Sequence, residues 1–168
     1  MALGTNLESD IRAAITNSDN ASDFSSKFST AVNNYLSGAE YAEDSGTYTS
    51  TLPSNLFLLP TAGTASLAAT QIANGVQAYY GTGTVVAGIG SASQGGVSVV
   101  QCTITATLVS STLQPSLLAI FNSVAGTLEA KAGELATAVT TAIATISTSH
   151  TELNGSGSTI GPFTGGVM

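Results

Sequence analysis

Charged side chains are scarce in this 168-residue chain. Asp, Glu, Lys and Arg together make up 8% of it, whereas about a quarter of the residues in an average protein are charged. Residues 45–128, half of the chain, contain no Asp, Glu, Lys, Arg or His. A free soluble domain normally distributes charge over its whole surface, because charge prevents association. We therefore expect this uncharged interval, together with the C-terminal arm, to form surfaces that pack against other protein.

Positive charge is the rarest kind. Arg12, Lys27 and Lys131 stand against ten acids, which gives a formal net charge of −7. Three scattered cations cannot form the basic stripe that nucleic-acid binding relies on, and the same count disfavours an anionic membrane surface. We therefore expect neither nucleic acid nor membrane among the partners. Seven of the acids fall in the first 44 residues, so the N-terminal segment is the part expected to face water.

Long apolar runs are also missing. Ser, Thr, Gly, Asn and Gln interrupt the uncharged interval every few positions, and no run approaches the roughly 18 apolar residues that a membrane-spanning helix needs. The first ten residues show neither the positive n-region nor the apolar h-region of a secretory signal. We expect synthesis and retention in a cytoplasm, without a signal peptide.

Cysteine and histidine occur once each, as Cys102 and His150. One cysteine excludes an intramolecular disulfide and a cysteine cluster for metal, and in an apolar run a free thiol is usually a small core residue. A catalytic cysteine needs an adjacent base, but nothing in the sequence brings Cys102 to His150. A histidine at the end of a helix is more often there because its charged form suits the helix dipole. We predict no catalytic residue, metal, cofactor or small-molecule substrate, and hence no enzyme.

Helical periodicity covers much of the chain. Apolar residues recur at spacings of three and four, and capping residues mark several starts. Thr5-Asn6-Leu7-Glu8 has the form of a capping box, Thr64 precedes a third helical pattern, and Ser111 or Thr112 could cap a fourth with Pro115 in its first turn. The patterns predict helices near residues 6–16, 22–37, 64–80, 111–124 and 127–150.

Two segments have strand character. Residues 84–89, between glycines, suit a strand or an ordered loop. Over residues 97–109, apolar side chains alternate strictly with Gln101, Thr103 and Thr105, which is the period of a half-buried strand; a helix is the alternative. Strands near 84–89 and 97–109 added to the helices predict a mainly α fold with a small β element, in the α+β class.

The length and the 43% hydrophobic content suit one compact core. We predict a single assembly domain over residues 1–153 and a flexible arm over residues 154–168, which is too rich in Gly and Ser to hold regular structure unaided. Large apolar residues within the uncharged interval and the arm are the candidate assembly contacts: Leu56, Phe57, Tyr79, Tyr80, Ile160, Phe163 and Val167.

The order of these segments resembles that of a known class of proteins. A short amphipathic helix from Leu7 to Ile15, a second helix ending Thr30-Ala-Val-Asn-Asn-Tyr35-Leu, a Gly/Thr/Val-rich centre and a Gly-Ser tail resemble small virion structural proteins of tailed bacteriophages. The resemblance spans most of the chain and is one of style. It implies a structural subunit of the particle, in the tail or neck or bound to the capsid, with copies of itself and other virion proteins as partners.

Two other classes share part of this pattern. An extracellular surface-lattice or pilus-like subunit has a similar Ser/Thr/Gly-rich, lysine-poor composition, and a cleavable leader would favour it. A small enzyme with an unrecognised site comes third, and a ligand pocket formed by polar side chains would support it. The virion subunit is favoured because interface cores are depleted in charge and because rings and filaments repeat one patch in every copy.

Overall fold

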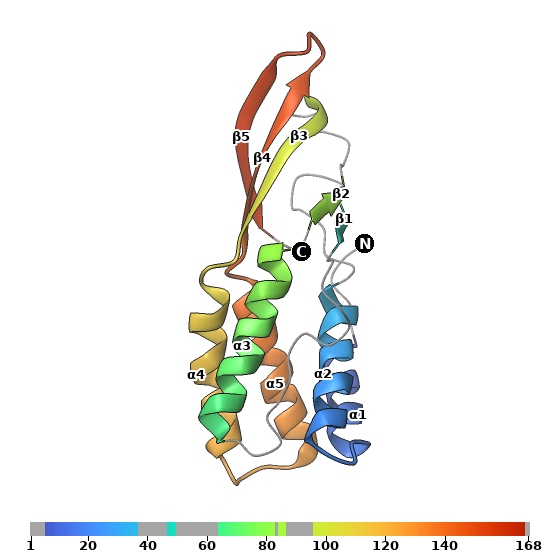
Figure 1. Cartoon of the computed structure of the whole chain (residues 1–168), viewed down its shortest axis with the longest axis vertical. Helices are drawn as coiled ribbons and strands as arrows, with labels where there is room; N and C mark the ends of the chain where they lie inside the picture. Colours follow the sequence, from blue (N-terminus) through green and yellow to red (C-terminus); the bar gives the residue numbers. More distant parts are fainter. Residues whose placement is uncertain (1–5, 37–46, 50–63, 83, 87–95, 167–168) are drawn as a thin grey trace.

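The computed structural model describes residues 6–36, 47–49, 64–82, 84–86 and 96–166. The molecule is elongated, with a bundle of helices at one end and a three-stranded sheet projecting from the other (Figure 1). The fold is mainly α with a smaller β part, which confirms the predicted class. The helices are α1 Leu7–Thr16, α2 Ala21–Leu36, α3 Ala65–Thr82, α4 Val109–Asn122 and α5 Leu128–Ile143. The strands are β1 Thr47–Thr49, β2 Thr84–Val86, β3 Gly96–Thr105, β4 Ser147–Asn154 and β5 Thr159–Gly166.

Threonine side chains cap two of the helices. Thr64 Oγ1 accepts a hydrogen bond from Leu67 N–H at 3.3 Å, as predicted for the start of α3. Thr127 Oγ1 accepts one from Ala130 N–H at 3.2 Å and so caps α5. Helix α1 begins after Asn6, and Thr5 of the predicted capping box lies outside the described residues. Each cap satisfies a backbone N–H that has no partner within its own helix.

Helix α4 begins earlier than predicted. Its first residue is Val109, so neither Ser111 nor Thr112 caps it and Pro115 lies in the helix interior. Val109, Leu113 and Leu117 share one face at spacings of four and are all fully buried. Burying Val109 on that face extends the helix towards its N-terminus, and this gain outweighs the backbone hydrogen bond that an interior proline cannot donate.

The last predicted helix is too long. Helix α5 ends at Ile143, and Ser147–Asn154 form β4 instead. Ser and Thr are poor helix formers, and pairing with β3 supplies the backbone hydrogen bonds that a longer helix would have provided. The predicted flexible arm, residues 154–168, also contains regular structure, because Thr159–Gly166 pair with β4 as β5. Pairing with a neighbouring strand gives this Gly-rich segment the order that it could not hold alone.

The strands form two sheets. Strands β1 and β2 pair antiparallel, and β3, β4 and β5 form an antiparallel sheet with β4 in the centre. We call β3–β4–β5 the projecting sheet. The strand predicted near 97–109 is confirmed as β3, although it ends at Thr105. The segment predicted near 84–89 contains β2, and residues 87–89 of it lie outside the described part.

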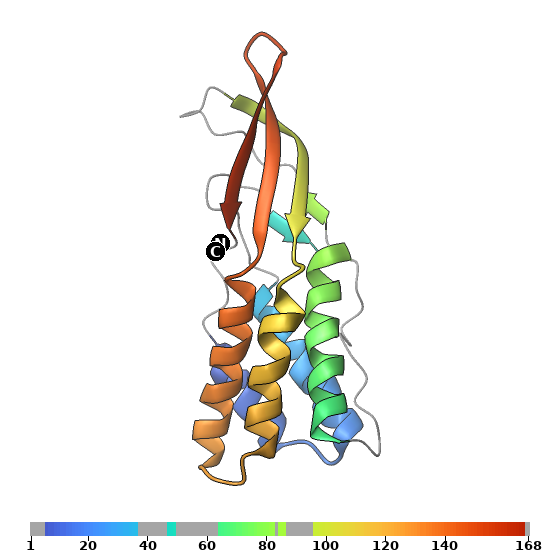
Figure 2. The ribbon, with the colours of Figure 1, turned by 90° about the vertical axis from the view of Figure 1, so that its left-hand side faces the viewer.

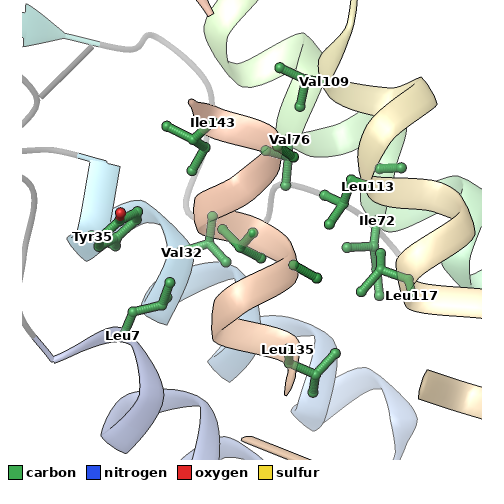
Figure 3. Close-up of a cluster of buried hydrophobic side chains, with 14 of the residues drawn as sticks. Leu7, Val32, Tyr35, Ile72, Val76, Val109, Leu113, Leu117, Leu135 and Ile143 are labelled. Carbon is green, nitrogen blue, oxygen red and sulfur yellow. The ribbon is translucent and has the colours of Figure 1, made fainter. Parts of the chain in front are cut away.

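The helices pack in two layers. Helices α3, α4 and α5 lie side by side in one layer, and α1 and α2 lie behind them (Figure 2). Side chains from all five helices meet between the layers, among them Val32, Ile72 and Leu135 (Figure 3). Ala106 and Ile146, in the connections to β3 and β4, are also buried. None of the residues of the projecting sheet whose exposure is described is buried. The bundle therefore holds the fold together and presents the sheet.

We expect Leu113→Ala to lower the free energy of unfolding by about 2–5 kcal/mol, because it opens a cavity at a fully buried site. Leu108→Ala is the matched control, since Leu108 is 58% exposed, and it should cost less than about 1 kcal/mol. Urea denaturation followed by circular dichroism measures both. Equal losses in the two variants would show that the core is not where the structure places it.

Thr127→Ala should destabilise the protein by about 1 kcal/mol, because it removes the side-chain acceptor at the start of α5. The control is Thr140→Ala in the same helix. Thr140 is exposed, and alanine is the better helix former, so this change should be neutral or slightly stabilising. Thermal unfolding measures the melting temperatures. Equal melting temperatures for the wild type and both variants would contradict the cap.

Candidate interaction site

Charge is confined to one side of the bundle. Helices α3 and α4 carry no Asp, Glu, Lys, Arg or His along their whole length, and we call them the uncharged side. Helices α1, α2 and α5, the charged side, carry every Asp, Glu, Lys and Arg described in the bundle except Asp19, which lies between α1 and α2. Two ion pairs lie there, Asp23–Lys27 at 2.7 Å and Lys131–Glu134 at 2.9 Å between nitrogen and oxygen. One side of the bundle therefore carries charged side chains and the other does not.

The uncharged interval is only partly surface. The inner faces of α3 and α4 contribute residues such as Ile72, Val76 and Leu113 to the core of the chain itself. Polar side chains link the two helices, because Gln114 Nε2 donates to Thr70 Oγ1 at 2.9 Å and Ser110 N–H donates to the side-chain oxygen of Gln77 at 3.0 Å. The expectation that residues 45–128 pack against other protein is thereby narrowed, within the described helices, to their outer faces.

Several large apolar side chains are exposed at the end of the bundle farthest from the projecting sheet. Leu67 lies in the first turn of α3, Val124 in the connection between α4 and α5, and Leu128 at the start of α5. Val124 is fully exposed, and the two leucines are about 40% exposed. Figure 1 places the start of α3 and the α4–α5 connection at this same end of the bundle. Uncharged and partly apolar surface is thus present at the end opposite the sheet.

The projecting sheet itself has uncharged edges. Strands β3 and β5 contain no Asp, Glu, Lys, Arg or His, whereas the central strand β4 contains His150 and Glu152. Every residue of the sheet whose exposure is described is half-buried or exposed. Among the described residues, no further strand pairs with the outer edge of β3 or of β5. Edge strands are normally protected against further pairing by charge, proline or bulges, and here charge is missing from both.

The predicted assembly contacts fall into three groups. Ile160 and Phe163 lie in β5, where Ile160 is half-buried and Phe163 is the register partner of His150. Tyr79 and Tyr80 lie near the C-terminal end of α3, which meets the base of β3 (Figure 1). Leu56, Phe57 and Val167 lie outside the described residues. The first two groups are therefore brought to the sheet and its base.

The sequence did not foresee that Cys102 and His150 would be neighbours. They are register partners in β3 and β4, and the prediction missed this because it placed His150 on a helix. A metal site would need a third ligand of this kind. In the part of the chain that the structure describes, no group of three His, Cys, Asp or Glu residues could hold a metal ion.

An open groove of about 370 Å³ runs between α1 and α2. Asp10, Asn17 and Lys27 contribute polar atoms to it, and small side chains such as Ala13 and Ala14 form much of the rest. The ammonium of Lys27 donates to the carbonyl oxygen of Asn17 at 2.6 Å as well as to Asp23. This lysine is therefore engaged in joining the two helices.

No helix in the described residues combines the length and the apolar character that crossing a membrane would require. No family model, curated protein or solved structure matches the chain. The function is therefore inferred from the geometry and the charge distribution of the molecule itself.

The ion pair on α2 makes a testable electrostatic prediction. Hydrogen bonds from the Lys27 ammonium and from Asp19 N–H hold the pKa of Asp23 below its ordinary value. We expect Lys27→Met to raise the pKa of Asp23 towards that value, as measured by NMR titration of the carboxyl carbon. Lys131→Met, which removes the other ion pair, should leave the pKa of Asp23 unchanged.

The sign of the linked pH dependence follows from this shift. Because the pKa of Asp23 is lower in the folded state, its contribution to stability is present above the unfolded-state pKa and is lost as the pH falls through the folded-state pKa. In Lys27→Met, protonation of Asp23 at low pH should therefore cause a smaller loss of stability. An unchanged Asp23 titration in Lys27→Met would show that the ion pair does not form in solution.

Proposed function

We propose that this chain is a structural subunit of a viral particle, a tail or neck component or a capsid-binding protein of a tailed bacteriophage. It acts through repeated contacts with copies of itself and with other virion proteins, and it performs no catalysis. The observation that carries the proposal is the projecting sheet, whose edges are uncharged and whose described side chains are not buried within the chain.

A small sheet is stable only when it has a buried face or packs on another element. Here the helical bundle is anchored by its own core, while the sheet extends beyond it (Figure 1). Unpaired edge strands without charge promote aggregation in a protein that functions as a monomer. They are useful in a subunit whose sheet is completed by its neighbours.

The charge distribution of the helices supports the same role. With a net charge of −7, copies of the chain repel one another unless they meet through surfaces that lack acids. The uncharged side, α3 and α4, and the edges of the projecting sheet provide such surfaces. The charged side, α1, α2 and α5, is suited to face water. The resemblance to small virion structural proteins, seen in the order of sequence segments, agrees with this arrangement.

Self-association is the first property to measure. We expect light scattering coupled to size exclusion to show a mass that rises with protein concentration towards a discrete ring or a filament. Because the proposed contacts lack charge and salt screens the repulsion between copies, raising the salt from about 0.1 M to about 1 M should not lower the mass. A mass equal to that of one 16.7 kDa chain at every concentration would count against repeated contacts between copies.

A further inference from the structure

The two edge strands of the projecting sheet each have a regular stretch next to the bundle. Four consecutive rows of residues run straight across the three strands next to the bundle: Cys102–His150–Phe163, Thr103–Ser149–Thr164, Ile104–Thr148–Gly165 and Thr105–Ser147–Gly166. Beyond these rows the register shifts, between Val99 and Gln101 in β3 and between His150 and Glu152 in β4. Each edge therefore has a regular stretch at the same level of the molecule.

The irregular features of β5 lie outside this stretch. Gly161 has a φ of +111° and Pro162 has no backbone N–H to donate, and both precede Phe163, the first β5 residue of the four rows. Residues 163–166 of β5 are therefore uninterrupted by proline. The facing stretch of β3, residues 102–105, contains the β-branched residues Thr103, Ile104 and Thr105, which favour strand pairing.

Strand direction decides how copies could meet. Strands β3 and β5 both run antiparallel to β4, so they run parallel to each other. A rotation about an axis along the strands preserves their direction. Under such a rotation, β3 of one copy meets β5 of the next as a parallel pair, and the same contact repeats around the axis.

We propose that β3 of one copy pairs with β5 of the next, so that the projecting sheets join into one continuous sheet around a closed ring. This inference rests on the proposed function, because it names the contact through which the subunit assembles. A contact between two different edges is heterologous, and it generates a ring when the rotation closes. A closed ring has no unpaired edge strand, so it cannot aggregate through the two uncharged edges.

A second copy fits these edges better than an unrelated partner. Both halves of the contact are on the same chain, at the same level, and neither contains Asp, Glu, Lys, Arg or His. Two chains of net charge −7 can therefore meet there without bringing carboxylates together. His150 and the acid Glu152 of the sheet are on the central strand β4, away from both edges.

Two lysine variants in the same row test the contact. Thr103→Lys places a charge on the β3 edge, and Thr164→Lys places the same charge on the β5 edge, because both residues align with Ser149. Charge on an edge strand blocks the addition of another strand. Each variant should raise the concentration needed for association by about tenfold or more, because the added lysine lies at the proposed edge-to-edge contact. Thr140→Lys, on the exposed surface of α5, is the control for added charge.

Mixing the two variants distinguishes the ring from other assemblies. Thr103→Lys retains an intact β5 edge and Thr164→Lys retains an intact β3 edge, so an equal mixture should form a dimer that grows no further. Light scattering gives the mass of each sample. Circular dichroism and the melting temperature establish that each variant is folded, and any unfolded variant is replaced by the corresponding Thr→Asn change.

The possible outcomes are separable. If Thr164→Lys assembles like the wild type while Thr103→Lys does not, β3 pairs with itself or with another partner, and the ring is overturned. If the wild type assembles and both variants assemble equally well, the edges are not the contact and only this inference fails. A wild type that is monomeric at every concentration would contradict the proposed function itself. Two monomeric variants that dimerise on mixing support the ring.

Discussion

The fold depends on the burial of the apolar faces of the helices. The core lies between the layer of α3, α4 and α5 and the layer of α1 and α2, and its largest fully buried side chains come from the helices. Helix α4 follows β3 directly, and β4 follows α5 directly, so the packing of α4 on α5 brings β3 and β4 together. Ala106 and Ile146 are buried in these two connections and anchor the sheet to the bundle. A sheet with no described buried residue of its own is thereby held in place by a core that lies elsewhere.

Helical periodicity and strand alternation were sufficient to predict the main elements. The stripes of α2 and α3 and the alternation of β3 are local patterns, and each element formed where its pattern indicated. The boundaries failed where a distant segment decided the outcome. Helix α5 ends at Ile143 because β4 pairs with β3, and β5 is ordered because it pairs with β4. Sequence spacing contains no information on which segment will be available to pair.

The candidate site was predictable only in outline. The uncharged interval and the apolar residues Ile160 and Phe163 in the arm were visible in the sequence, and both residues lie in an edge strand. The sequence could not show that part of the uncharged interval turns inward, because α3 and α4 use their inner faces in the core. It also could not align Thr103 with Thr164, since both align through Ser149, a residue that the periodicity assigned to a helix.

The orientation of the strands along the long axis of the molecule (Figure 1) has a mechanical consequence. Hydrogen bonds between antiparallel strands lie across the strand direction. A pull that draws β5 lengthwise past β4 therefore loads all the hydrogen bonds between them in shear, and they must break together. A pull across the sheet would instead peel β5 away, one bond after another, starting at one end. The pairing of β5 with β4 should therefore resist lengthwise sliding far better than sideways peeling.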